Sequence, residues 1–150
     1  VKEAIENDPL LIAYFGHGSV KMWGKDSLLS TEDIAALNNL DQLPIMFHFT
    51  CLTGLFTHPD VESLTEGLLW HPTGGAVAVF APTSLTLSYE QWHLAKAIAQ
   101  GLFKDNNPRL GDVILSTWRQ VPADTPNTRD VMLTFLLFGD PALSLPYLKP

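Results

Sequence analysis

The chain has 150 residues, which is enough for one domain with a packed core and too few for two ordinary domains. Apolar residues make up 46% of it and the formal net charge is −7, so an extended disordered chain is excluded and nucleic acid is not expected as a partner. No apolar run approaches the roughly 20 residues that span a bilayer, so no membrane span is expected in this segment.

The first third of the chain combines helix signals with two continuous apolar runs. Each run is short and bounded by turn residues, which is typical of a strand buried on both faces of a sheet. Ser30 is a candidate helix N-cap, with Asp33 three positions later as an imperfect capping box. The predicted elements are a helix over residues 1–7, a strand over 10–15, a helix over 31–37 and a strand over 44–50.

The rest of the chain continues the alternation. A third buried strand follows Gly74-Gly75, and apolar residues then recur at helical spacing. A later run, over residues 131–138, is apolar throughout and is interpreted as a helix, after a polar loop over 121–128. The predicted elements are a helix over residues 61–70, a strand over 76–80, helices over 89–103, 110–118 and 131–138, and a closing strand over 143–145.

Strands that alternate with helices predict an α/β fold with a largely parallel sheet. Only three or four strands are visible, which is few for a doubly wound domain. The chain also begins with Val1 in place of an initiator Met. We therefore expect a piece of a longer protein whose first strands lie upstream.

Two side chains suited to covalent chemistry follow consecutive predicted strands. His17 comes directly after the first strand, and Cys51, the single cysteine, ends the second. Consecutive parallel strands joined by one helix are usually neighbours, and ligands bind beyond the carboxyl ends of such strands. The sequence therefore predicts that His17 and Cys51 share one site.

This pair suits the cleavage of an amide bond. A Cys thiolate attacks the carbonyl carbon, and a His donates a proton to the departing amine. The backbone N–H groups of Gly18 and Cys51 are the expected oxyanion hole, because glycine lets the chain approach closely. On spacing alone, a tight glycine turn carrying a half-exposed His17 beside a structural Cys51 is an equally good interpretation.

Five segments carry a resemblance that favours the first interpretation. They are Tyr14-Phe15-Gly16-His17-Gly18-Ser19 with Trp23-Gly24, Thr50-Cys51-Leu52-Thr53-Gly54-Leu55-Phe56, Ser63-Leu64-Thr65-Glu66, Gly74-Gly75-Ala76-Val77-Ala78 through Thr83, and Phe138-Gly139-Asp140-Pro141-Ala142-Leu143. In this order they resemble the His motif, the Cys motif, the following helix, the next strand and the Gly-Asp-Pro ending of the gingipain-like cysteine peptidases, in the caspase-like clan.

The resemblance implies a caspase-like three-layer α/β/α sandwich with a mostly parallel sheet, truncated at its N-terminus. Residues 1–150 would be the C-terminal portion of one catalytic domain. The implied activity is that of a cysteine-type endopeptidase that cleaves proteins or peptides through a thioester on Cys51. His17 would be the proton donor, acting across the substrate. The family also suggests a bacterial enzyme that is secreted or on the cell surface.

The chain departs from the family pattern in two respects. Thr50 stands where the family often has a small apolar residue. In addition, the family's upstream acidic residue and much of its specificity pocket would precede residue 1, so the missing N-terminal part of the same chain is an expected partner. The main alternative is a catalytically inactive caspase-like scaffold that serves as a binding or assembly domain of a larger surface protein.

Other chemistries fit the sequence less well. His48, Cys51 and His58 lie close in sequence, but the first two are three apart in a strand and would point to opposite faces, which disfavours zinc. Gly16-x-Gly18 lacks the third glycine of a dinucleotide-binding turn, and Gly-x-Ser-x-Gly is absent. No metal or other cofactor is expected. The resemblance allows structural calcium, although no carboxylate loop identifies a site.

Three further residues are candidates for substrate binding by position. Trp23 follows the His17 loop, with core packing as an equal alternative, and Thr83 and Ser84 end the third predicted strand. Glu66 and Asp140 are interpreted as structural, the first as a helix carboxylate and the second as a turn former.

Overall fold

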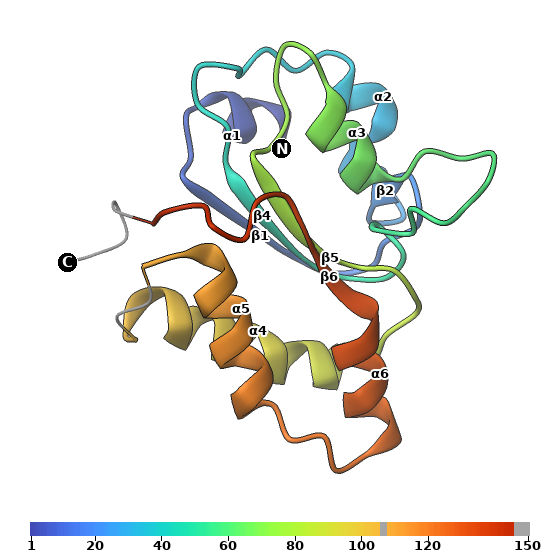
Figure 1. The fold of residues 1–150 in the computed structure, drawn as a ribbon. Coiled ribbons are helices and arrows are strands. Elements are labelled where there is room, and N and C mark those ends of the chain that lie inside the picture. The colour runs from blue at the N-terminus through green and yellow to red at the C-terminus, as the bar shows by residue number, and fades with distance from the viewer. Residues whose placement is uncertain (106–107, 146–150) are drawn as a thin grey trace. The chain divides into compact units, whose positions relative to one another are not determined.

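The computed structural model describes residues 1–105 and 108–145, which form two compact units (Figure 1). The first unit comprises residues 1–85 and 134–139, and the second comprises the remaining described residues. In chain order the elements are α1 (Lys2–Glu6), β1 (Leu11–Phe15), β2 (Met22–Trp23), β3 (Leu29–Ser30), α2 (Thr31–Ile34), β4 (Ile45–Phe49), α3 (Leu64–Trp70), β5 (Ala78–Pro82), α4 (Ser88–Phe103), α5 (Leu110–Gln120), α6 (Pro126–Thr134) and β6 (Phe135–Phe138).

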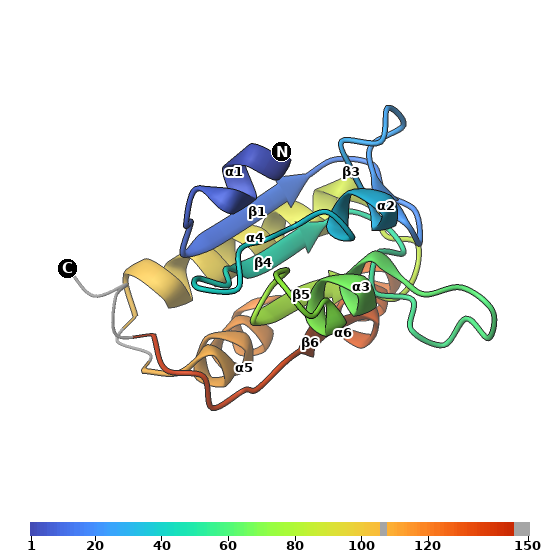
Figure 2. The ribbon, with the colours of Figure 1, turned by 90° about the horizontal axis from the view of Figure 1, so that it is seen from above.

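A four-stranded sheet in the order β1-β4-β5-β6 organises the first unit (Figure 2). The first three of these strands are parallel, and β6 runs antiparallel to β5. The predicted α/β fold with a mostly parallel sheet is therefore confirmed. In β4 and β5 every residue is buried, which agrees with sequences that are apolar at every position except His48 of β4.

The core of the first unit lies between the sheet and helices α1, α2 and α3, which lie on one of its faces (Figure 1). Ile5 of α1 and Leu64 and Leu68 of α3 are fully buried there, against Met46 and Val79 of the central strands. Each such aliphatic side chain contributes about 1.5–3 kcal/mol when it is removed from water. This packing fixes the strands whose ends carry the candidate site.

Two capping boxes set the starts of the short helices. Ser30 Oγ accepts from the Asp33 amide, and the Asp33 carboxylate accepts from the Ser30 amide at 2.8 Å, as predicted. Ser63 and Glu66 do the same for α3, which therefore begins at Leu64 and not at residue 61. Glu66 is thus a structural carboxylate, as expected.

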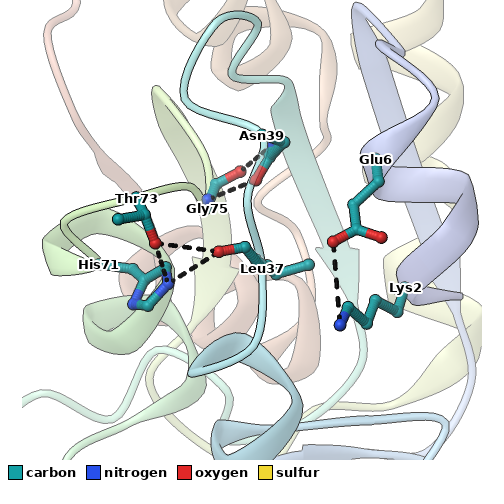
Figure 3. A network of polar contacts seen from close by, with 7 residues as sticks. All are labelled: Lys2, Glu6, Leu37, Asn39, His71, Thr73 and Gly75. Atoms are coloured by element: carbon teal, nitrogen blue, oxygen red, sulfur yellow. Dashed lines mark hydrogen bonds and ion pairs between the residues drawn. The ribbon is translucent and has the colours of Figure 1, made fainter.

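The turn before β5 is held by side chains from the segment after α2 (Figure 3). The Asn39 side chain accepts from the Gly75 amide at 2.8 Å and donates to its carbonyl at 3.1 Å. Gly75 has a φ of +106°, which glycine adopts readily. His71 Nε2 and Thr73 Oγ1 each lie 3.1 Å from the Leu37 carbonyl oxygen. The strand starts two residues later than predicted, and the amides of the two preceding residues, Ala76 and Val77, donate to the carbonyls of Leu68 at 2.9 Å and Pro44 at 3.0 Å.

Two predicted elements in the last part of the chain are wrong. Residues 131–138 form the last part of α6 and then the strand β6, in which Phe138 pairs with Val79. A run that is apolar at every position except Thr134 fits both periodicities, so the open edge of β5 decides its conformation. The expected closing strand over residues 143–145 is reduced to an isolated bridge between Ser144 and Arg109.

Strand β1 also differs from expectation. It was predicted to be buried on both faces, yet it is an edge strand of the described sheet and Phe15 is 56% exposed. The structure adds a short hairpin of β2 and β3, in which Trp23 pairs with Leu29. Strands of two residues are too short to produce a recognisable alternation in the sequence.

The second unit is helical. Helices α4 and α5 pack against each other and match their predicted positions to within two residues. Helix α6 begins inside the stretch predicted as a loop, because Thr125 and Thr128 exchange side-chain-to-amide hydrogen bonds at 3.2 Å and Pro126 takes the first helical position. No helix among the described residues is both long enough and apolar enough to cross a membrane.

Candidate active site

The two candidate catalytic residues follow neighbouring strands that end at the same level. Phe15, the last residue of β1, pairs with Phe49, the last residue of β4, and the Gly16 amide donates to the Phe49 carbonyl at 3.2 Å. His17 and Cys51 each lie two residues beyond these paired positions. The carboxyl ends of β1 and β4 therefore present both residues at the same edge of the sheet, as the topology argument predicted.

The loop that carries His17 lies directly against the backbone of Cys51. A methyl group on Gly18 would lie 2.9 Å from the Cys51 carbonyl oxygen and would overlap Thr50 Oγ1. Only a residue without a Cβ permits this approach. Gly18 is therefore the point at which the two loops meet.

The backbone of His17 is fixed from two directions. Its carbonyl oxygen accepts from the Gly24 amide at 2.7 Å and from the Tyr14 hydroxyl at 2.9 Å. Burial raises the pKa of Tyr14 above its ordinary value, so this hydroxyl stays protonated as a donor. The His17 side chain itself is exposed, which leaves the imidazole accessible to a ligand.

The amide of Gly18 takes no part in the hairpin that follows it. Gly18 and Trp23 form an antiparallel bridge. Its two hydrogen bonds run from the Ser19 amide to the Met22 carbonyl and from the Gly24 amide to the His17 carbonyl. Neither of these two hydrogen bonds uses the Gly18 N–H.

Cys51 occupies a turn whose backbone is held by the end of β5. It is half-buried, and the next residue, Leu52, has a φ of +63°. A left-handed conformation costs a residue with a Cβ roughly 1–2 kcal/mol. The Leu52 amide donates to the Ser84 carbonyl at 3.1 Å and the Gly54 amide donates to the Pro82 carbonyl at 2.9 Å, which holds the turn in place.

The three residues predicted to contact substrate have different environments. Ser84 is half-buried and touches the Cys51 turn through its carbonyl oxygen, while Thr83 donates both its amide and its hydroxyl to the Thr134 carbonyl. Trp23 is only 2% exposed and belongs to the core. The expectation that Trp23 lines the cleft is therefore corrected in favour of core packing.

The sequence of the chain matches the family model of peptidase family C25 over residues 1–146. The chain belongs to this family. Two related proteins of Porphyromonas gingivalis are 28% identical to it over 149 residues, Gingipain R2 and Gingipain R1. Each alignment covers 93% of this chain, but only 20% of that Gingipain R2 and 15% of that Gingipain R1.

Solved structures of family C25 share the fold of this chain. The crystal structure of the Arg specific cysteine proteinase gingipain R matches with a TM-score of 0.87 at 25% identity, and the complex of the P. gingivalis RgpB pro- and mature domains matches with 0.84 at 27%. Both matches cover 95% of this chain and 35% of the solved chain. The C25 chain thus has the caspase-like fold of gingipain R and spans about a third of those solved chains.

One feature of this chain that the sequence did not reveal is a column of aromatic rings behind the two loops. Tyr14 stacks on Trp23 with ring centroids 4.4 Å apart, and Trp23 meets His48 edge to face at 4.9 Å. His48 Nδ1 lies 3.2 Å from Thr53 Oγ1. The only signal in the sequence is a histidine inside an otherwise apolar strand, three residues before Cys51.

No metal centre emerges around these residues. Within residues 1–105 and 108–145, no group of three or more His, Cys, Asp or Glu side chains is placed to hold a metal ion. His48 is fully buried and bonded to Thr53, while His58 is exposed. The described residues therefore provide no ligand set for zinc at Cys51.

The close contact at Gly18 leads to a specific prediction. Gly18→Ala is expected to push the His17 loop away from Cys51 and to lower kcat/KM by about tenfold or more, because small displacements of reacting groups are costly.

Gly67→Ala is the matched control. Gly67 lies in α3, and its added methyl would meet Ile34 Cδ1 at an ordinary 3.4 Å, so activity should be unchanged and stability should rise by about 0.5–1 kcal/mol. Steady-state kinetics and urea unfolding measure both effects, and equal kcat/KM values for the two variants would contradict the role of Gly18.

Proposed function

We propose that this chain carries the nucleophile and the proton donor of a cysteine-type endopeptidase, namely Cys51 and His17. Membership of peptidase family C25 supports the reaction class. The observation that carries the proposal is the contact of Gly18 with the Cys51 backbone, which brings the His17 loop against the Cys51 turn at the ends of adjacent strands. A structural cysteine would not need a histidine-bearing loop packed at this point.

In the proposed reaction the Cys51 thiolate attacks the carbonyl carbon of the scissile peptide bond. The negative charge that develops on the carbonyl oxygen is received by the N–H groups of Gly18 and Cys51. The C–N bond then breaks while His17 gives a proton to the departing amine, which leaves an acyl group on Cys51 as a thioester. Water attacks the thioester carbonyl carbon while His17 accepts a proton from it. The C–S bond then breaks, which releases the second product as a carboxylic acid and restores the Cys51 thiolate.

The exposed imidazole supports a role for His17 across the substrate from Cys51. Gly24 and Tyr14 hold its backbone, whereas its side chain faces solvent, so a peptide can lie between the two catalytic groups. Thr83 and Ser84 are the proposed flank of this cleft on the β5 side. Ser84 reaches the Cys51 turn through its bond to the Leu52 amide.

We further propose that protein or peptide chains are the substrates and that additional regions of the protein complete the specificity pocket. The small share of the related proteins that this chain spans supports the second point, as does a matched structure that is a complex of pro- and mature domains. The resemblance to gingipains also supports an enzyme that acts outside the cell.

Active-site labelling tests the assignment. Peptide acyloxymethyl ketones that differ in their terminal residue are incubated with the full-length protein, folded or denatured in urea, and the modified residue is located by mass spectrometry. Labelling of Cys51 in the folded protein alone is expected, because this probe requires an aligned nucleophile and proton donor. If folded and denatured protein react alike, or Cys51 is not labelled, the chain is an inactive caspase-like scaffold.

A further inference from the structure

We propose that His48 is a positioning residue that fixes the His17 loop and the Cys51 turn relative to each other. It does so by contacting Trp23 on one side and Thr53 on the other. This inference rests on the proposed function, and it assigns a role to a buried histidine that the proposed chemistry does not use.

The first contact reaches the His17 loop. Trp23 forms a β-bridge with Gly18. The next residue, Gly24, donates its amide to the His17 carbonyl. Trp23 also stacks on Tyr14, whose hydroxyl donates to the same carbonyl. The edge-to-face contact of His48 with Trp23 therefore sets the position of the ring on which the His17 loop is built.

The second contact reaches the Cys51 turn. Thr53 is fully buried, and its hydroxyl oxygen lies 3.2 Å from His48 Nδ1. Its carbonyl accepts from the Thr65 amide at 3.0 Å, which ties the turn to the first residues of α3. Thr53 lies two residues after Cys51, with the left-handed Leu52 between them. The bond to His48 thus anchors the far side of this strained turn.

The chemistry of this position favours such a role over simple packing. β4 is buried at every residue, and an imidazole is costly to bury unless its nitrogens are hydrogen-bonded. Only Nδ1 has a hydrogen-bond partner among the described residues, and Nε2 has none. An aliphatic residue would pack here without the cost of burying polar nitrogens, but it could not form a hydrogen bond with Thr53.

His48 is suited to orient other groups and not to transfer protons itself. It is fully buried, and burial lowers its pKa to about 3, so the ring is neutral throughout the neutral pH range. The indole N–H of Trp23 is likewise buried without a hydrogen-bond partner among the described residues. The two rings lie at 86°, the arrangement in which the N–H of one ring can face the π system of the other.

A pair of threonine substitutions tests the inference. Thr53→Val removes the hydroxyl that contacts His48 and keeps the side-chain shape. Thr65→Val is the matched control, because Thr65 is equally buried and its hydroxyl has no partner among the described residues. In the full-length protein we expect Thr53→Val to lower kcat by about tenfold with KM unchanged, and Thr65→Val to change neither. Thr53→Ser, which retains the hydroxyl, should restore the rate.

Cys51 labelling separates positioning from stability. Reaction with iodoacetamide needs only the Cys51 thiolate, whereas an acyloxymethyl ketone also needs the proton donor in place. Thr53→Val should slow the second reaction about tenfold and leave the first unchanged. His48→Asn places a hydrogen-bonding atom near the position of Nδ1, so it should retain more activity than His48→Leu. Equal kcat values for the two valine variants would overturn the positioning role alone, whereas wild-type protein that lacks Cys51 labelling would overturn the proposed function as well.

Discussion

Cys51→Ala is expected to reduce kcat by a factor on the order of 10⁴ or more, because it removes the atom that forms the covalent intermediate. Cys51 is half-buried at a turn, so removing its sulfur should change the free energy of unfolding by less than about 1 kcal/mol. The activity loss and the unchanged stability together distinguish a nucleophile from a structural cysteine. Hydrolysis of a fluorogenic peptide and urea unfolding provide the two measurements.

His17→Ala should reduce kcat by about 10²–10⁴, the usual contribution of a general acid–base group. It should still react with iodoacetamide at Cys51, because the thiol remains in place. Removing both residues should cost no more than removing Cys51 alone, since the two groups act in one reaction path. His71→Ala is the matched histidine control. Its imidazole bonds to the Leu37 carbonyl away from both loops, so kcat should not change.

Two results would contradict these roles. Full-length Cys51→Ala protein with normal hydrolysis would exclude the cysteine as nucleophile, whatever the behaviour of His17. A His17→Ala protein with unchanged kcat, in which Cys51→Ala is inactive, would require another proton donor. Among the described histidines, His48 is excluded from that role by its complete burial.

The sequence alone predicted that His17 and Cys51 follow the ends of neighbouring parallel strands. The two apolar runs before His17 and Cys51 are continuous and end at turn residues, so both the strands and their parallel pairing could be inferred. Adjacent parallel strands then require their ends to lie together, without any knowledge of side-chain packing. The start of α2 was predictable for a similar reason, because Ser30 and Asp33 form a purely local capping box.

The packing behind the site could not be predicted in the same way. Trp23, His48 and Thr53 come from a two-residue strand, a central strand and a turn, and nothing in the local sequence indicates that they touch. For the same reason the sequence could not decide whether Trp23 faces the substrate or the core. The prediction of a helix at the position of β6 was wrong for a different reason, because its continuous apolar sequence is compatible with both a helix and a strand.

Stability is expected to fall in acid because of His48. The ordinary pKa of a histidine is 6.5, and burial lowers the pKa of His48 to about 3 in the folded protein. Between these values the unfolded chain binds a proton that the folded chain rejects. The contribution of the neutral, buried His48 to the free energy of unfolding is therefore complete above pH 6.5. It decreases as the pH falls below 6.5 and is lost at about pH 3. From pH 7.5 to pH 4.5 it should decrease by about 2–3 kcal/mol.

The comparison with His48→Phe isolates this contribution from that of the carboxylates, which titrate in both proteins. Phe keeps a ring beside Trp23 but cannot bond to Thr53, so the variant should be less stable than wild type at pH 7.5. Because it has no imidazole to protonate, its stability should fall less steeply on acidification, and the gap in the free energy of unfolding should shrink by about 2–3 kcal/mol at pH 4.5. Urea unfolding at several pH values measures the gap. A gap that stays constant from pH 7.5 to 4.5 would mean that the imidazole is protonated as easily in the folded protein as in the unfolded chain. That result would contradict the lowered pKa of His48.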